Sequence, residues 1–363
     1  MKVKKLALCL AVIAATGFCA SYSDMSSVQA ATRTEIRAIA VSKDGDFKYW
    51  NTHSIAKDKL ISYVQDVTNP KSKNYIPVPY RVAVFDMDGT LIGEKAPSYT
   101  DGVFYADRVL HDPNCHVSSE DKAFAQAYWN AISSRKPLPD HIYHNLYEKL
   151  YAGLSGMTLQ EFDAYADTFF NKPVMGFSNM KYGEAFFLPM VEVISYLNAN
   201  DFTCYIISAS NRPLVRNMVK DVIPITPDHI IGSDSYIVSS HQGETPGESY
   251  DLSYTDTIQY GKMDRIQEKM NKVSSIIKEI GQQPVLAFGN SSGDYSMFRY
   301  TLLNNPHKSA VFNVLCDDTE REYGNLDKAE KARTTSEKNG WNTISMKHDW
   351  NTIYGDNVQK VRK

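Results

Sequence analysis

A short apolar run that ends in two acids constrains this chain more than any other stretch. Val82 to Phe85 carry only apolar, mostly β-branched or aromatic side chains, which is typical of a buried strand. The run stops at Asp86 and Asp88, which flank a single residue, and the turn former Gly89 follows at once. Side chains two apart in an extended chain point the same way, so these carboxylates can converge on one point. The pattern indicates either a catalytic site at a strand end or a simple turn into a loop.

The first 30 residues have the organisation of a secretory signal peptide. A basic start over residues 1–5 precedes an apolar run over residues 6–20, and Val28 and Ala30 are small residues at the −3 and −1 positions of a cut after Ala30. The apolar run is shorter than the roughly 20 residues that span a membrane. We therefore expect an exported protein, periplasmic or extracellular, which begins near Ala31 and has no stable membrane insertion.

Charge and cysteine content narrow the class of protein. The net charge of −3 gives no electrostatic case for a nucleic-acid partner. Beyond the predicted cut the cysteines are Cys115, Cys204 and Cys316, an odd number that permits at most one internal disulfide. Cys204 lies inside a strand-like run, so a disulfide, if one forms, is expected between Cys115 and Cys316. No CxxC pair or His/Cys cluster is present, so zinc is not expected.

Strands alternate with helices on both sides of a stretch that reads as helix alone. The alternating part has apolar strand-like runs at 35–41, 202–207, 284–288 and 310–315, and helical patterns at 57–67, 188–198, 214–222 and 263–280. The helical stretch has patterns at 119–134, 140–154 and 158–170, the last with a capping box formed by Thr158 and Glu161. We predict an α/β fold with a Rossmann-like, doubly wound parallel sheet core over residues 31–93 and 190–363, and an inserted helical cap domain over residues 94–189.

Polar groups follow three of the predicted strands. Asp86 and Asp88 follow the first, Ser208 ends the second, and Asn290 and Asp294 lie in a loop after the third. Ligands of such sheets bind at the carboxyl ends of the strands, so these groups are expected to meet there.

The residue types suit the hydrolysis of a phosphate monoester. Asp86 could attack phosphorus, which divides a difficult reaction into two steps, and Asp88 could protonate the leaving alkoxide and then activate water. Ser208, at the start of a helix, and Lys262 could bind the phosphate. Carboxylate and amide oxygens from Asn290 and Asp294, close to Asp86 and the Asp88 carbonyl, would suit Mg²⁺.

Four short motifs resemble those of the haloacid dehalogenase (HAD) superfamily of phosphatases. They are Asp86-Met-Asp88-Gly-Thr-Leu, Ile206-Ile-Ser208-Ala-Ser, Gly261-Lys262 and Gly289-Asn290-Ser-Ser-Gly-Asp294. They occur in the family's order between about Lys57 and Asp318, and the helical insertion falls where the family's C1 cap lies. The chain is most similar to the phosphoserine and phosphorylcholine phosphatase branch.

The resemblance implies the roles of the site residues. It assigns Asp86 and Asp88 to catalysis, and it implies that Gly89, Ser208, Ala209 and Lys262 bind phosphate. It also implies Mg²⁺ as the cofactor, with oxygen ligands supplied by Asp86, Asp88, Asn290 and Asp294.

Two positions depart from the pattern or are ambiguous. Asn290 stands where the family usually has Asp, which lowers the charge at the metal by one and leaves open whether Asn290 or Asp294 ligates it. Lys262 is preferred as the phosphate-binding lysine because its Gly-Lys pair precedes a predicted helix. The three lysines that follow are predicted to lie on a solvated face: Lys269, Lys272 and Lys278.

We therefore expect an exported, Mg²⁺-dependent phosphomonoesterase that acts on a small phosphate monoester through an aspartyl-phosphate. Two alternatives are a phosphotransferase that uses the same intermediate and a non-catalytic exported protein that binds a phosphate ligand. The aromatic residues Tyr99, Trp129 and Tyr182 either form a cage for a choline group, which would favour phosphorylcholine as substrate, or belong to the core of the insertion. The sequence does not indicate the oligomeric state.

Overall fold

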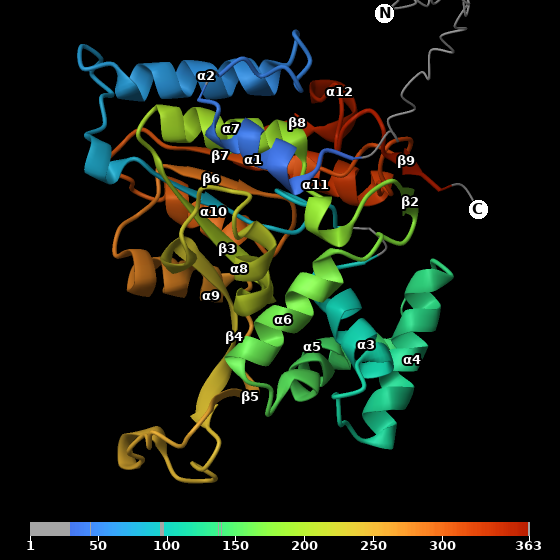
Figure 1. Cartoon of the computed structure of the whole chain (residues 1–363). Coiled ribbons are helices and arrows are strands. Elements are labelled where there is room, and N and C mark those ends of the chain that lie inside the picture. Colours follow the sequence, from blue (N-terminus) through green and yellow to red (C-terminus); the bar gives the residue numbers. More distant parts are fainter. Residues whose placement is uncertain (1–29, 44, 95–97, 137, 139, 362–363) are drawn as a thin grey trace, which may run out of the picture.

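The computed structural model describes residues 30–43, 45–94, 98–136, 138 and 140–361, and Figure 1 shows their arrangement. The strands are β1 (Val82–Phe85), β2 (Phe177–Ser178), β3 (Thr203–Asn211), β4 (Ile230–Ser239), β5 (Ile258–Arg265), β6 (Leu286–Gly289), β7 (Ala310–Leu315), β8 (Asn342–Ser345) and β9 (Gln359–Lys360). The helices are α1 (Arg33–Val41), α2 (Ile55–Thr68), α3 (Thr100–His111), α4 (Ser119–Ser133), α5 (Asp140–Leu154), α6 (Leu159–Phe170), α7 (Leu188–Ala199), α8 (Arg212–Val219), α9 (Met270–Ser275), α10 (Tyr295–Leu302), α11 (Leu326–Asn339) and α12 (Met346–Asp349).

The predicted signal peptide, residues 1–30, lies outside the described residues except for Ala30. Within the described part of the chain, no helix combines the length and the apolar character that a membrane crossing requires.

A seven-stranded sheet forms the centre of the molecule, in the order β5-β4-β3-β1-β6-β7-β8. Neighbouring strands run parallel except β5, which returns antiparallel to β4. The fully buried β1 lies between β3 and β6. Ala83 and Phe85 pack on one face, where α2 and α7 lie, and Val82 and Val84 pack on the other, against α10 (Figure 1). The prediction of an α/β fold with a Rossmann-like, mostly parallel sheet is confirmed. β1 is apolar throughout because other elements cover both of its faces.

An aromatic stack supports the strand ends that carry the polar groups. Phe85 of β1 stacks on Phe288 of β6 with ring centroids 4.5 Å apart, and Phe288 stacks on Phe312 of β7 at 5.2 Å. Asp86 and Gly289 follow the first two rings directly. The stack therefore fixes the relative height of the β1 and β6 ends, from which the site is built.

The inserted helices, α3 to α6, come after β1 and before α7 and β3. In Figure 1 these helices gather beyond one end of the sheet, apart from the helices that cover its faces. The predicted capping box at the start of α6 is confirmed: Thr158 Oγ1 accepts from Glu161 N at 3.2 Å, and the Glu161 carboxylate accepts from Thr158 N at 2.9 Å.

Three local predictions are wrong. Residues 35–41 belong to helix α1, because Thr32 and Glu35 form a capping box and Ile36 and Ala40, four residues apart, are buried on one face. Residues 263–265 belong to strand β5, so the helix expected from 263 begins only at Met270. Cys115 and Cys316 are both free, so the disulfide is not formed.

The last segment of the chain packs against the core, where Tyr354 contacts the buried acid Glu322. The ring of Tyr354 packs against Phe177 and Phe187, and its hydroxyl contacts the carboxylate of Glu322. Gly93 makes room for this contact, because a Cβ there would lie 2.1 Å from the Tyr354 hydroxyl oxygen. Burial raises the pKa of Glu322 to about 7.

Replacing Glu322 by Gln should flatten the pH dependence of stability. The folded-state pKa lies above its unfolded value, so Glu322 contributes stability that is present at low pH and is lost as the pH rises through 7. Urea unfolding at pH 5 and pH 8 should show the free energy of unfolding falling by up to about 3 kcal/mol more in the wild type than in Glu322→Gln. Parallel pH profiles would contradict this.

Candidate active site

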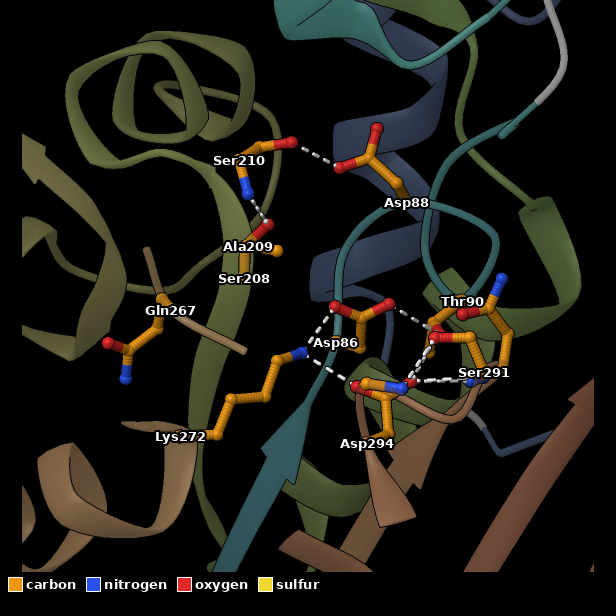
Figure 2. Close-up of polar contacts among 12 residues, drawn as sticks. Asp86, Asp88, Thr90, Ser208, Ala209, Ser210, Gln267, Lys272, Ser291 and Asp294 are labelled. Atoms are coloured by element: carbon orange, nitrogen blue, oxygen red, sulfur yellow. Dashed lines mark hydrogen bonds and ion pairs between the residues drawn. The ribbon is translucent and has the colours of Figure 1, made fainter. Parts of the chain in front are cut away.

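A buried lysine holds two buried carboxylates together at the carboxyl ends of β1 and β6 (Figure 2). Lys272 Nζ, from helix α9, lies 2.7 Å from Asp86 Oδ1 and 2.6 Å from Asp294 Oδ1. Lys272 and Asp294 are each only 1% exposed, and Asp86 is 6% exposed. Charges so deeply buried are tolerated only when they are paired and hydrogen-bonded, so this triad fixes the positions of all three side chains.

Asp294 also anchors the loop that follows β6. Its Oδ2 accepts hydrogen bonds from the backbone N–H groups of Asn290 and Ser291, both at 3.0 Å. A Cβ at Gly289 would lie 2.6 Å from Asp294 Cγ, so only glycine allows this close approach. Both carboxylate oxygens of Asp294 are therefore committed to protein donors.

Asp88 lies apart from this lysine and is held by a hydroxyl. Ser210 Oγ donates to Asp88 Oδ2 at 2.6 Å, whereas Asp88 Oδ1 is buried and has no hydrogen-bond partner among the described residues (Figure 2). Burial raises the pKa of Asp88 to about 7, and the negative charge of Asp101 on α3 adds to the effect. Burial and the charge of Asp294 raise the pKa of Asp86 to about 7 as well, although Lys272 opposes this shift.

The structure brings Ser208 to the same strand ends. Phe85 pairs with Ile206 in the parallel ladder, so Ser208 lies on β3 beside the residues that follow β1. Ser208 is fully buried, and its Oγ accepts from Ser210 N at 3.0 Å. The carbonyl of the neighbouring Ala209 accepts from Ser233 Oγ at 2.5 Å.

Gly89 forms the turn after Asp88, with a φ of +78° that side chains with a Cβ rarely adopt. Its N–H donates to the carbonyl of Ile92 at 2.7 Å. Asp86, Asp88 and Gly89 directly follow β1, as predicted, and Ser208 and Ala209 lie beside them on β3. The strand does not end at Ser208 as predicted, because β3 continues to Asn211 and α8 begins only at Arg212.

The prediction that Lys262 belongs to the site is wrong. Lys262 is exposed and lies in the middle of β5, an edge strand, instead of at the start of a helix. Lys272, which the sequence pattern assigned to a solvated face, occupies the site. The sequence did contain an indication that Lys272 points inward. Lys272 directly precedes Val273 and lies four residues before Ile276, and both of these residues are buried. At helical spacing this places Lys272 next to the apolar stripe of the helix.

Sequence reasoning also missed two polar partners of the predicted residues. Ser210 positions Asp88, and Glu94 accepts from Asn290 Nδ2 at 3.1 Å. Ser210 could have been inferred, since it lies two residues from Ser208 and so on the same side of the strand. Glu94 had no comparable local signal.

The three aromatic residues considered for a choline cage have separate partners. The hydroxyl of Tyr99 donates to Glu94 at 2.9 Å, Trp129 packs edge-on against His111, and Tyr182 stacks on Phe169. Each of these three side chains thus has a different partner among the described residues.

The oxygen donors at the site fit a hard cation such as Mg²⁺. Among the described residues Asp86 Oδ2 accepts only a long contact of 3.4 Å from Thr90 Oγ1. Asn290 adds an amide oxygen. Within the described ranges no group of three or more His, Cys, Asp or Glu side chains is arranged to hold a metal, so a cation here would also need amide, backbone or water oxygens, as Mg²⁺ commonly does.

The chain belongs to the haloacid dehalogenase-like hydrolase family, whose model matches residues 83–299, more than half of its length. No curated protein sequence matches it.

Solved structures of other proteins resemble this chain at low sequence identity. A conserved protein of unknown function from Anaerococcus prevotii DSM 20548 matches with a TM-score of 0.50 and 14% identity, covering 85% of this chain and 97% of that one, and so shares the fold. A phosphoserine phosphohydrolase-like protein from Francisella tularensis subsp. tularensis SCHU S4 has a TM-score of 0.37 and 13% identity, with 65% of this chain and 87% of that one covered. A cytosolic 5'-nucleotidase IIIB bound to cytidine has a TM-score of 0.45 and 11% identity, with 82% and 88% covered.

Replacing Lys272 by Met should destabilise the fold strongly, because it leaves Asp86 and Asp294 buried together without a cation. Breaking a buried ion pair by removing one partner costs about 3–5 kcal/mol. The matched control, Lys262→Met, should change the free energy of unfolding by less than about 0.5 kcal/mol, since Lys262 is exposed. Denaturant unfolding of both variants measures this, and similar losses would contradict the assignment of Lys272.

Proposed function

We propose that this hydrolase is an exported phosphomonoesterase that transfers the phosphoryl group of a small phosphate ester first to Asp86 and then to water. The observation that carries the proposal is the presence of two buried acids directly after β1, of which only Asp86 is paired with the buried ammonium of Lys272. A nucleophilic carboxylate must be charged, and a neighbouring cation favours that form. The second acid must exchange a proton, and a pKa of about 7 suits this task.

The proposed reaction assigns each step to a residue of the chain. An oxygen of Asp86 attacks phosphorus and forms an acyl phosphate while the bond between phosphorus and the ester oxygen breaks. Protonated Asp88 gives its proton to the leaving alkoxide, which departs as the alcohol. Asp88, now a carboxylate, accepts a proton from water as the water oxygen attacks phosphorus, which releases phosphate and restores Asp86.

The remaining groups position the two acids and neutralise the charge of the phosphoryl group. Ser210 holds Asp88 through its 2.6 Å hydrogen bond, and Ser208 offers a hydroxyl in the second half of β3. Lys272 keeps Asp86 beside Asp294 and supplies a positive charge that stabilises the developing phosphoryl charge. Asp86, the backbone carbonyl of Asp88 and Asn290 would hold Mg²⁺, which when bound would neutralise charge on the phosphoryl oxygens.

The burial of the site has a consequence for access. Asp86 and Asp88 are 6% and 8% exposed. In the proposed cycle the inserted helices, which follow Asp88 in sequence and bring the charge of Asp101 to bear on it, move to admit the ester and then exclude water from the acyl phosphate.

Phosphate release by the purified chain, started after Ala30, tests the proposal. The panel includes phosphorylcholine, phosphoserine, phosphoethanolamine, a sugar phosphate and a nucleotide, each with Mg²⁺ and with chelator. We expect release that requires Mg²⁺. Asp86→Asn should abolish it, and Asp88→Asn should reduce kcat by about 10²–10⁴-fold, the usual contribution of general acid–base catalysis.

Two results would redirect the proposal. Alcohol production without matching phosphate release, with the phosphoryl group recovered on an added alcohol, would indicate a phosphotransferase. Binding of phosphate esters without any turnover would indicate a binding protein. The order of the esters in the panel identifies the substrate class, and secretion of the chain fused to a reporter tests the export.

A further inference from the structure

A second buried network lies behind Asn290, and its centre is Glu94. Glu94 is 5% exposed, and its Oε2 accepts from Asn290 Nδ2 at 3.1 Å. Lys328 Nζ, from α11, donates to both oxygens of Glu94 at 2.7 and 2.8 Å. The Tyr99 hydroxyl, at the start of α3, donates to Oε1 at 2.9 Å. Glu94 therefore ties the inserted helices and α11 to the loop after β6.

The chemistry of a carboxylate fixes the orientation of the Asn290 amide. A carboxylate only accepts hydrogen bonds, so the amide must turn its NH₂ group towards Glu94. Its oxygen then faces away from Glu94, and among the described residues Asn290 Oδ1 accepts no hydrogen bond. An asparagine with its NH₂ group held in this way presents one free oxygen in one direction.

The amide also lies directly on the turn that carries the catalytic acids. A Cβ at Gly89 would be 1.8 Å from Asn290 Nδ2 and 3.0 Å from Glu94 Oε2. The absence of a side chain at Gly89 therefore leaves the space in which Glu94 and Asn290 meet. The position of the amide relative to Asp86 and Asp88 is set by this contact.

We propose that Glu94 is a positioning residue that orients the oxygen of Asn290 towards a bound Mg²⁺, and that a neutral residue at 290 is required because Glu94 lies next to it. The inference rests on the proposed function in that it takes Mg²⁺ as the cation of this site. Lys328 and Tyr99 hold the Glu94 carboxylate in one place.

The pairing gives a physical reason for asparagine at this position. An aspartate at 290 would place two carboxylates at hydrogen-bond distance with no proton between them, and like charges so close together repel strongly. Glu94 and Asn290 are thus a matched pair of one acid and one amide. A pocket of about 540 Å³ lies against Asn290 and is lined also by Ser291, Lys328 and Lys331.

A double-mutant cycle on Mg²⁺ binding tests the role. Calorimetric titration with MgCl₂ is made on the wild type, Glu94→Gln, Asn290→Asp and the double variant. Glu94→Gln should weaken Mg²⁺ binding by about 10-fold or more in the wild-type background, the usual effect of losing a residue that orients a metal ligand. In the Asn290→Asp background the same change should strengthen binding, because the glutamine amide introduced at position 94 can donate to the new carboxylate.

If Glu94 had a merely structural role, the effect of Glu94→Gln on Mg²⁺ affinity would not change sign between the two backgrounds. Glu322→Gln is the matched control, since Glu322 is also a buried acid but has no contact with Asn290, and its Mg²⁺ affinity should stay within about twofold of the wild type. Equal effects of Glu94→Gln in both backgrounds would overturn the proposal, and so would a wild-type chain that binds no Mg²⁺. Phosphate release is assayed separately, so a chain that binds Mg²⁺ but hydrolyses no ester contradicts the proposed function alone.

Discussion

The ammonium group of Lys272 holds the site together. It lies between two carboxylates that follow different strands, and all three groups are almost completely removed from water. Two acids this close would otherwise repel each other, and one would have to take up a proton. The lysine therefore allows the loops after β1 and β6 to lie side by side. It also attaches α9 to the carboxyl ends of the strands, where a ligand would bind.

The two acids of the first motif differ because their surroundings differ. Asp86 is buried beside a cation, whereas Asp88 is buried beside a serine hydroxyl and under the negative charge of Asp101. Burial raises the pKa of both residues to about 7, although they are separated by a single residue. They differ in the neighbouring charge: Lys272 opposes the shift at Asp86, whereas Asp101 adds to the shift at Asp88. A nucleophile and a general acid can thus be made from two aspartates by their environments alone.

The inserted helices are connected to the site by polar contacts. Tyr99, which precedes α3, contacts Glu94, and Glu94 contacts Asn290 in the loop after β6. Movement of α3 would therefore change the hydrogen bonds around Glu94. This connection gives the helices a physical means of acting on the residues that would hold a cation.

Local pattern along the chain was enough to predict a large part of the fold and of the site. An apolar run predicted the buried strand Val82–Phe85 with the acids after it, the position of Ser208 on β3, and the loop from Asn290 to Asp294. Their meeting follows because ligands of parallel sheets bind at the carboxyl ends of the strands. The family resemblance rested on the same motifs, and the matching of residues 83–299 to the family model bears it out.

Long-range packing, in contrast, selected the lysine that serves the site and the acid that holds Asn290. Lys262 matched a local motif, but β5 pairs antiparallel with β4 and carries Lys262 to an exposed edge, whereas α9 directs Lys272 inward. Glu94 and Lys328 are 234 residues apart in the chain and meet only because β1 and the elements around α11 pack at the same end of the sheet. Ion pairs of this kind leave no periodicity in the sequence, since their partners are brought together by the tertiary fold and not by spacing along the chain.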